Sequence, residues 1–440
     1  MGAGAAGCVV AAVLTKSGFE VTLVEGGPDR DPTHPTAPVN SADLFRAATA
    51  VHHVSAVRAS AGDGEPYRPY LRGVGIGGSG AINGLLLHRG TPEDYDRWAD
   101  LAGCRGWGSA DLWPRLQRRY NRGRIHSTVG PVDELVQAAF PVEPARFAID
   151  PNGLRACSAA TDLQLVRAAV TVRTDAAVQR VLLSAGQCVG VELASGETID
   201  ADLVVVSAGA IQSPLLLRRS GIDRPGIGAN LHDHPAISVA VPLPEPTPPT
   251  IAPTSVVSHF ASAGRTPHVQ VLPLNRTGLD NDAKRIGAVL VGVLEQHGRG
   301  SVHTTIDGTI TLDFNQTTDE RDRAGLRMAV GLAHRVLAGA RDVNASDPPP
   351  DPNESAAAID AWVTTHRGGY LHAAGTCRMG SPTEDLAVVD NNCQVIGISG
   401  LFVVDASIFP SQPRANPYLA TLAVAELASE RIAAIASSAS

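Results

Sequence analysis

Residues 2–7 read GAGAAG, which places glycines in the GxGxxG spacing of a dinucleotide-binding turn. Residues 8–17 are apolar enough for a buried helix, and residues 20–24 (EVTLV) have the composition of a strand. Glu25 ends that strand, close to the position about 20 residues after the glycines where an acidic side chain binds a ribose hydroxyl. The predicted contact residues of this nucleotide-binding unit are Gly2, Gly4, Gly7 and Glu25.

A unit of this kind requires a strand before its first glycine, and only Met1 precedes Gly2. That strand is central in a doubly wound sheet, so without it the neighbouring strands would bury unpaired backbone groups. We therefore expect an apolar strand of about five or six residues encoded upstream of Met1. The alternative, a flexible tail rich in glycine and alanine, is disfavoured by the strand and the acid that follow.

Later segments return to the same sheet. Residues 202–207 (DLVVVS) are a continuous apolar strand of the buried parallel type, and the helix after them ends at Gly221. Residues 180–183 and 190–193 predict a small hairpin. The stretch 72–90 (RGVGIGGSGAINGLLLHRG) has too many glycines for an ordinary helix or strand, which indicates a backbone passing close to another group.

The character of the chain changes twice. From residue 235 to about 366, Pro-rich loops separate segments in which apolar and polar residues alternate, at 268–274, 288–294 and 309–314. One helical run, at 320–340, lies in the same region. This pattern predicts an antiparallel sheet with helices behind it. The predicted fold class is α/β, with a doubly wound, Rossmann-like domain that lacks its first strand (1–234), an α+β substrate domain with an antiparallel sheet (235–366), and a C-terminal return to the first domain (367–440).

Composition excludes several classes of function. The 36 basic and 44 acidic residues give a net charge of −8, and no basic block is long enough to follow nucleic acid. No stretch approaches 18 uninterrupted apolar residues, and the N-terminus lacks the pattern of a signal peptide, so we expect no integral membrane segment. The six cysteines have no metal-ligand spacing and are interpreted as reduced, buried thiols of a cytoplasmic protein without a metal.

Five ordered motifs cover nearly the whole chain: GAGAAG with Glu25, the glycine-rich stretch 72–90, SAGAIQSPLLLRRSGI followed by GIGANLHDHP, HAAGTCRMG, and GLFVVDASIFP with RANP. Together they resemble the glucose-methanol-choline (GMC) family of flavin oxidoreductases, and the length and the GTCRMG ending are similar to the short bacterial members associated with mycofactocin. The resemblance implies FAD as cofactor and a choline dehydrogenase-like oxidation of a CH–OH group, as in an alcohol dehydrogenase or oxidase.

The resemblance also places the chemistry. His372 in HAAGTCRMG matches the family's catalytic histidine, and Asn416 in RANP matches a second position that relatives fill with His or Asn. An unperturbed histidine pKa near 6.5 suits a base that takes the alcohol proton while the carbinol hydride goes to flavin N5. An asparagine at the second position implies one neutral donor for the developing alkoxide.

The remaining cofactor contacts implied by the resemblance are Gly77, Gly78, Ser79, Asn83, Val178, Asp405, Ala406, Pro417 and Thr421. Some relatives attach the flavin covalently through a histidine, where this chain has Ile82, so we expect non-covalent FAD. Residues 223–225 replace a longer family insertion.

Several alternatives stay open at the level of sequence. His232 and His234 are interpreted as parts of a structural turn because no third metal ligand is near, and Cys377 as a core residue. Competing functions are a nicotinamide enzyme, a hydroxynitrile lyase-like enzyme that uses the site without redox turnover, and a truncated flavin-fold protein without catalysis. The expected partners are a small alcohol and an electron acceptor, which could be oxygen, a quinone or a protein carrier.

Overall fold

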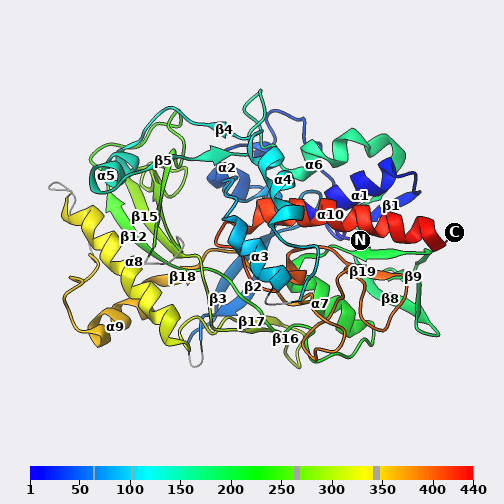
Figure 1. The fold of residues 1–440 in the computed structure, drawn as a ribbon. Coiled ribbons are helices and arrows are strands. Elements are labelled where there is room, and N and C mark those ends of the chain that lie inside the picture. The colour runs from blue at the N-terminus through cyan, green and yellow to red at the C-terminus, as the bar shows by residue number, and fades with distance from the viewer. Residues whose placement is uncertain (63–64, 101–102, 262–267, 340–346, 440) are drawn as a thin grey trace.

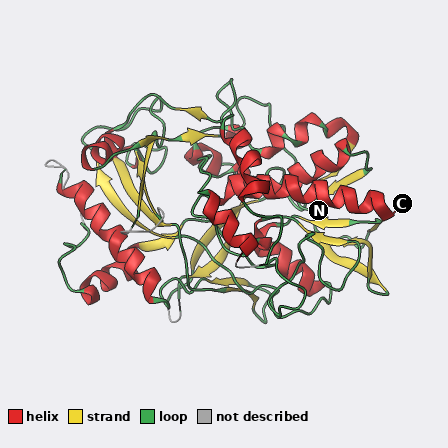
Figure 2. Ribbon diagram, viewed as in Figure 1, coloured by secondary structure: helices red, strands yellow, loops and turns green. Residues whose placement is uncertain are grey.

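The chain folds around two main groups of strands, which Figure 1 shows toward opposite ends of the molecule. The computed structural model describes residues 1–62, 65–100, 103–261, 268–339 and 347–439. Short strands flanked by helices lie near both termini, whereas the other group is a broad sheet with helices along its outer face (Figure 2). The helices are α1 (Ala5–Lys16), α2 (Leu44–Ala48), α3 (Pro92–Asp100), α4 (Ser109–Tyr120), α5 (Pro131–Ala139), α6 (Ser158–Thr161), α7 (Gly209–Arg219), α8 (Glu320–Ala338), α9 (Ala356–His366) and α10 (Pro417–Ala439).

Two parallel strand pairs form the nucleotide-binding region: β1 (Val21–Val24) with β7 (Val170–Arg173), and β11 (Val204–Val206) with β19 (Leu401–Val403). Met1 lies between the pairs. Its amino group donates to the carbonyl oxygen of Val205 at 2.7 Å, and its carbonyl oxygen accepts from the N–H of Ser207 at 2.8 Å. On the other side the N–H of Gly2 donates to the carbonyl oxygen of Val24 at 2.7 Å. The position at which the sequence predicts a strand thus holds Met1, which is hydrogen-bonded to the second strand pair.

Helices α1 and α10 pack together beside these strands (Figure 1). The α1 sequence AAGCVVAAVLTK places mostly small residues against its neighbours, which lets the helices approach closely. In α10, residues 419–425 are buried on every side, as expected of a helix that is apolar all round and lies in a core. Each fully buried Val or Leu here contributes about 1.5–3 kcal/mol through removal of apolar surface from water.

The predicted hairpin is present as β8 (Val178–Ser184) and β9 (Gln187–Leu193), and β10 (Thr198–Asp200) extends it to three antiparallel strands. Strand β11 leads into α7, as the sequence predicts, and Gly221 after that helix has a positive φ of 75°. Glycine adopts this conformation without the steric penalty of a side chain, which explains the helix end.

The broad sheet has six strands in the order β18-β12-β15-β14-β13-β5. They are β18 (Arg367–Gly369), β12 (Pro235–Pro242), β15 (Ile286–Val293), β14 (Val269–Leu274), β13 (Val256–Phe260) and β5 (Glu143–Pro144), and every pairing among them is antiparallel. Alternate residues such as Ile237, Val239 and Val241 are buried in a core with α8, α9 and α5. The opposite face is turned toward the first group of strands and supplies one wall of the site described below.

One predicted strand has a different partner from the one expected. Residues 309–314 form β17 (Ile310–Asp313), but β17 pairs parallel to β2 (Val54–Ser60) in a separate sheet with the order β16-β17-β2-β3. The other two strands of this sheet are β3 (Arg68–Gly73) and β16 (Ser301–Thr304). A short pair, β4 (Arg124–Ile125) and β6 (Arg146–Phe147), lies apart. The strand was predictable from its alternation, whereas its partner was not, because pairing depends on contacts distant in sequence.

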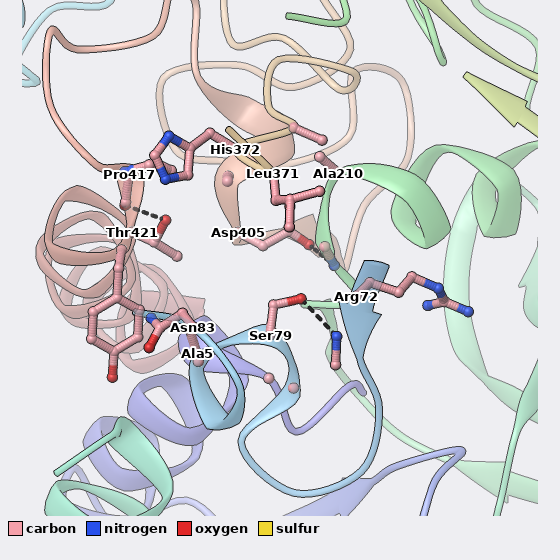
Figure 3. A pocket seen from close by; sticks show the side chains of 18 of the residues that line it. Ala5, Arg72, Ser79, Asn83, Ala210, Leu371, His372, Asp405, Pro417 and Thr421 are labelled. Atoms are coloured by element: carbon pink, nitrogen blue, oxygen red, sulfur yellow. Dashed lines mark hydrogen bonds between the residues drawn. The ribbon is translucent and has the colours of Figure 1, made fainter. Parts of the chain in front are cut away.

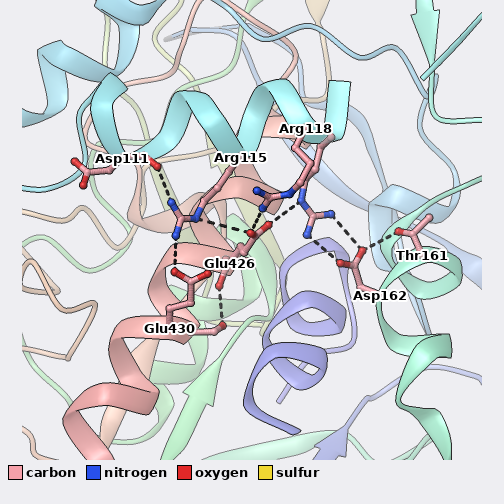
Figure 4. Close-up of polar contacts among 10 residues, drawn as sticks. Asp111, Arg115, Arg118, Thr161, Asp162, Glu426 and Glu430 are labelled. Carbon is pink, nitrogen blue, oxygen red and sulfur yellow. Dashed lines mark hydrogen bonds and ion pairs between the residues drawn. The ribbon is translucent and has the colours of Figure 1, made fainter. Parts of the chain in front are cut away.

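An arginine cluster on α4 joins this helix to α10 (Figure 4). Arg115 pairs with Glu430, and Arg118 pairs with Glu426. Arg119 is the most buried of the three, and its Nε lies 3.3 Å from Glu426 while its Nη2 lies 2.9 Å from Asp162 after α6. Ion pairs on both sides of a largely enclosed arginine fix the position of the C-terminal helix, whose N-terminal end borders the site.

Candidate active site

A cavity of about 730 Å³ runs between the nucleotide-binding strands and the broad sheet. The sequence-predicted residues along it are Gly2, Gly4, Glu25, Gly78, Ser79, Asn83, Val178, His372, Asp405, Ala406, Asn416, Pro417 and Thr421. Figure 3 shows His372, Pro417 and Thr421 together on one side, with Ser79 and Arg72 elsewhere along the same cavity. The fold therefore brings together segments from the start, the middle and the end of the chain.

At one end the first glycines form a turn under the N-terminus of α1. Gly2 has a φ of +85°, which favours glycine. Gly4 is the cap residue of α1 and has no side chain to bond the first turn, and Gly4, Ala5 and Ala6 line the cavity, so this helix end has the form of the helix N-termini that bind phosphate. The carboxylate of Glu25 accepts from the N–H of Ala3 at 2.7 Å and of Gly27 at 2.9 Å.

Two predicted contacts, Gly7 and Gly77, lie outside the cavity lining. A Cβ on Gly7 would stand 1.8 Å from the carbonyl oxygen of Gly2, so this glycine permits close packing of α1 against the turn. The N–H of Gly77 donates to the carbonyl oxygen of Ala3 at 2.7 Å, and its φ is +98°. Both glycines therefore stabilise the conformation of the turn without lining the cavity.

The glycine-rich stretch passes against the same turn. A Cβ on Gly78 would stand 2.8 Å from the Cα of Gly4, so the two backbones touch. The hydroxyl of Ser79 accepts from the N–H of Gly73 at 3.1 Å. Asn83 is held by Arg155, whose Nη1 donates to its Oδ1 at 2.9 Å. These contacts explain why the stretch is neither a long helix nor a strand.

Asp405 anchors the middle of the cavity. Its carboxylate accepts from the N–H of Gly209 at 2.8 Å, the hydroxyl of Ser213 at 2.6 Å and the N–H of Ser407 at 2.7 Å. These bonds tie the end of β19 to the start of α7. Ala406 follows Asp405 along the cavity wall.

At the far end His372 and Asn416 face each other. The Nδ2 atom of Asn416 lies 3.4 Å from Nε2 of His372. Burial, and secondarily the nearby His234, lower the pKa of His372 well below its ordinary value, so the imidazole is neutral at pH 7. The Oδ1 atom of Asn416 is buried without a hydrogen-bond partner among the described residues. Next along the chain, Pro417 begins α10 and its carbonyl oxygen accepts from the hydroxyl of Thr421 at 2.8 Å.

The backbone around His372 is held by buried polar side chains. Asp233 Oδ1 accepts from the N–H of His372 at 2.9 Å, and Oδ2 accepts from the hydroxyl of Tyr70 at 3.0 Å. Gln412 donates to the carbonyl oxygen of His372 at 2.5 Å. The residue before it, Leu371, has a φ of +64°, an unusual conformation for leucine that surrounding contacts must maintain.

Sequence reasoning missed the neighbour of this histidine. His234 was assigned to a structural turn together with His232, yet its Nδ1 lies 3.0 Å from Nδ1 of His372. His232 fits the turn interpretation, because its Nδ1 bonds to the carbonyl oxygen of Asn230 at 2.7 Å. No signal in the motif NLHDHP distinguishes the two histidines, since only the pairing of β12 with β18 brings one of them to His372.

Other predictions concern groups near the site. Cys377 is buried, and burial raises the pKa of its thiol well above the ordinary value, which fits a core residue. No cluster of three or more potential metal ligands occurs among the described residues. Within the same part of the chain, every helix is too short or too polar to traverse a bilayer.

Comparisons with known proteins agree with this architecture. Two family models described as GMC oxidoreductase match the chain, the N-terminal one over residues 1–142 and 145–236 and the C-terminal one over 296–425. An oxygen-dependent choline dehydrogenase of Xanthomonas campestris is 30% identical over 98% of this chain and 94% of its own length. A 5-(hydroxymethyl)furfural oxidase of Methylovorus is 29% identical over 98% of this chain and 97% of its own length.

Solved structures are similar over the same extent. Pyridoxine 4-oxidase from Mesorbium loti has a TM-score of 0.85 at 26% identity, and the match covers 98% of this chain and 97% of that one. A formate oxidase of Aspergillus oryzae has the same TM-score of 0.85 at 19% identity, over 99% of this chain and 98% of that one. These likenesses confirm the predicted combination of a Rossmann-like FAD-binding region with a substrate region.

Proposed function

This chain belongs to the GMC oxidoreductase family and is an FAD-dependent enzyme that acts on alcohols, and from that premise we propose that His372 is the base that takes the hydroxyl proton. Asn416 is the proposed donor to the same oxygen. The product is the corresponding carbonyl compound. The observation that carries the proposal is the 3.4 Å pairing of Asn416 Nδ2 with His372 Nε2 at the edge of the cavity.

The residues along the cavity fit FAD. The uncapped N-terminus of α1 suits a pyrophosphate, and Glu25 suits a ribose hydroxyl. Gly4 leaves no side chain between its backbone and a bound group, Gly78 lets its own backbone pack against Gly4, and Val178 lies at the Glu25 end where an adenine would pack. When bound, the isoalloxazine ring supplies the acceptor for the carbinol hydride.

The protonation state of His372 fits the role of a base. Its pKa is held well below the ordinary value by burial, so Nε2 can offer a lone pair at neutral pH. The alcohol hydroxyl would donate to Nε2 and accept from Nδ2 of Asn416. A neutral donor strengthens its bond as negative charge develops on the oxygen, without adding a second proton to the site.

Anaerobic mixing of the holoenzyme with an alcohol panel tests this function. We expect loss of the oxidised flavin absorbance with an alcohol, and no loss in His372→Ala on the same timescale. Cyanide release from a cyanohydrin without flavin reduction would instead assign the lyase alternative. A chain that binds no FAD would assign the non-catalytic alternative.

The second half of the experiment identifies the electron acceptor. The substrate-reduced enzyme is mixed with oxygen, with a soluble quinone, and with buffer alone. Several relatives and structural neighbours are named as oxidases or as oxygen-dependent enzymes, and on that basis we propose that oxygen reoxidises this enzyme. Reoxidation by quinone with no reaction toward oxygen would assign a dehydrogenase.

A further inference from the structure

The part of the cavity next to His372 is bounded by the inner face of the broad sheet. Leu272 and Leu274 of β14 and Leu290 of β15 line it, and Leu272 is directly opposite Leu290 in the strand register. Thr254 also lines it, but its hydroxyl donates to the carbonyl oxygen of Pro273 at 2.6 Å. These four side chains therefore offer a substrate apolar contacts, and none of them has a polar group free to bond it.

The wall facing the sheet is also uncharged. It is formed by His126 and by apolar side chains from separate segments, which are Ala42, Leu44, Leu85, Leu86 and Phe147. Burial lowers the pKa of His126, which keeps this imidazole neutral at pH 7. His372 is neutral for the same reason.

The charged side chains along the cavity lie in its middle and toward the end opposite His372. Among the described lining residues, the carboxylates are Glu25 and Asp405, and each accepts at least three hydrogen bonds from the protein. The guanidinium of Arg72 interacts electrostatically with the carboxylate of Glu25. Arg219 donates to the carbonyl oxygen of Gln179, beside Val178. These charges flank the proposed nucleotide contacts, and no charged side chain among the described residues lines the cavity next to His372, because the nearby carboxyl of Asp233 is buried behind the lining and accepts from the N–H of His372 and the hydroxyl of Tyr70.

We propose that the substrate is an uncharged alcohol with an apolar body, such as an aryl or branched alkyl primary alcohol. Transfer of an unpaired ammonium or carboxylate into this region would cost its hydration without a compensating ion pair. Alcohols that carry a quaternary ammonium or a carboxylate are excluded on this ground. The proposal rests on the proposed function, because it concerns the substrate of that same site.

Matched pairs of alcohols test the substrate class in the unmodified holoenzyme. Choline and 3,3-dimethylbutan-1-ol have the same shape and differ in charge. The pair of 4-(hydroxymethyl)benzoate and 4-methylbenzyl alcohol differs in charge and is similar in shape. The measured quantity is the anaerobic rate constant of flavin reduction divided by the substrate Kd. We expect each neutral alcohol to exceed its charged partner by at least about 100-fold. Equal or faster reduction by choline would overturn the substrate class and leave the proposed function intact.

Failure of every alcohol to reduce the flavin would overturn the proposed function itself.

A variant pair gives a second measurement: Leu290→Glu places a carboxylate on the apolar wall, and Leu290→Gln is its uncharged control. The Glu variant should shift the preference toward choline by about 10-fold or more, and the Gln variant should not. An unchanged preference in a folded Leu290→Glu protein would contradict the placement of the substrate against this wall.

A second inference comes from an independent contact, that of His234 with His372. The Nδ1 atoms of the two rings lie 3.0 Å apart with the ring planes perpendicular, so one nitrogen donates and the other accepts. Nε2 of His234 is buried without a hydrogen-bond partner among the described residues, and burial lowers the pKa of the imidazole, so this ring is neutral at pH 7.

The amide nitrogen Nδ2 of Asn416 can only donate, so Nε2 of His372, 3.4 Å from it, is the acceptor of that pair. The single N–H of the neutral His372 ring is therefore on Nδ1, and it donates to Nδ1 of His234. A neutral histidine has only one N–H, so Nε2 of His372 must present a lone pair. That atom is the one facing Asn416 and the cavity.

We infer that His234 is a positioning residue, which selects the tautomer of His372 that can act as a base. The same contact persists when His372 takes a proton, since Nδ1–H still donates to His234. With the opposite tautomer, Nε2 of His372 would carry hydrogen and could not accept the alcohol proton. Other histidine bases are held in the required tautomer in the same way, by an acceptor for the ring N–H that faces away from the substrate.

Nitrogen-15 NMR of histidine-labelled holoenzyme tests the tautomer directly, with the His372→Ala spectrum used to assign the signal. We expect a protonated Nδ1 and an unprotonated Nε2 on His372. A protonated Nε2 in the neutral ring would overturn the inference.

A variant pair separates positioning from packing. Asn at 234 can present its amide oxygen near the position of Nδ1, whereas Leu cannot accept a hydrogen bond. We expect His234→Leu to slow flavin reduction about 100-fold with unchanged substrate Kd, and His234→Asn to recover most of that loss. His232→Asn is the control from the same turn and should keep the wild-type rate constant. Equal rates in His234→Leu and wild type would also overturn the inference.

Discussion

Asn416 reaches His372 across a long separation in sequence, with its Nδ2 atom 3.4 Å from the Nε2 atom of the histidine. Asn416 immediately precedes α10, and His372 follows the edge strand β18. The arginine cluster on α4 holds α10 in place, and Asp233 holds the backbone of His372. The geometry of the candidate base thus depends on two separately anchored segments.

Replacement of His372 should separate binding from chemistry. In His372→Ala we expect FAD to stay bound, because the nucleotide contacts lie elsewhere, and flavin reduction to slow by roughly 10²–10⁴-fold, as for loss of a general base. Anaerobic stopped-flow absorbance measures the rate. His303→Ala, a change at an exposed residue of β16, is the control and should keep the wild-type rate. An unchanged rate in His372→Ala would remove this residue from the mechanism.

Replacement of Asn416 should cost less than loss of the base. We expect Asn416→Ala to raise the barrier for flavin reduction by about 2–4 kcal/mol, as for loss of one donor to a developing oxyanion. Asn416→Asp should be slower still, because a carboxylate removes the donor and repels the alkoxide. Equal rate constants for the Ala and Asp variants would show that this side chain does not face the reacting oxygen.

Two glycines of the first turn should respond differently to alanine. A Cβ on Gly4 finds its nearest atom at 3.9 Å, so Gly4→Ala should fold normally and bind FAD more weakly because the methyl group enters the nucleotide path. A Cβ on Gly7 would stand 1.8 Å from the carbonyl oxygen of Gly2, so Gly7→Ala should lose at least about 1–3 kcal/mol of stability. Melting temperature and flavin content measure the two effects, and a wild-type melting temperature for Gly7→Ala would contradict the packing described.

Asp233 should contribute a characteristic dependence of stability on pH. Burial raises the pKa of this carboxyl to about 7, against hydrogen bonds from the backbone of His372 and from Tyr70, which lower it. Because the folded pKa exceeds the unfolded value, the stabilising contribution is complete below about pH 4 and is lost as the pH rises through 7.

Asp233→Asn cannot ionise and serves as the comparison. Relative to wild type, this variant should gain up to about 4 kcal/mol in unfolding free energy between pH 4 and pH 8. Urea unfolding at several pH values measures the difference. A difference that stays constant over this range would show that Asp233 is already ionised in the folded protein at low pH.

Acid precipitation should release all of the flavin. Ile82 occupies the position where some relatives carry the attaching histidine, and an alkyl side chain cannot form that bond. The supernatant should contain the full FAD absorbance, and the pellet should be colourless. Flavin that stays with the precipitated protein would point to attachment through another residue.

Local patterns in the sequence predicted much of the fold. The glycine turn with Glu25, strand β11 with helix α7, and the hairpin of β8 and β9 each lie within a short stretch. Backbone geometry and the burial period of a single element decide such features, so the residues themselves carry the information. The order of the family motifs then placed His372 and Asn416 as candidates before their contact was visible.

The tertiary structure alone decided which distant segments touch. Strand β17 was expected in the substrate sheet and pairs instead with β2, and His234 was assigned to a turn and contacts His372. The latter contact exists because Pro235 of β12 pairs with Gly369 of β18, which brings the flanking histidines together. Several pairings satisfy the same alternating pattern, and the packing of the whole chain selects one, so no local stretch could reveal the neighbour of the candidate base.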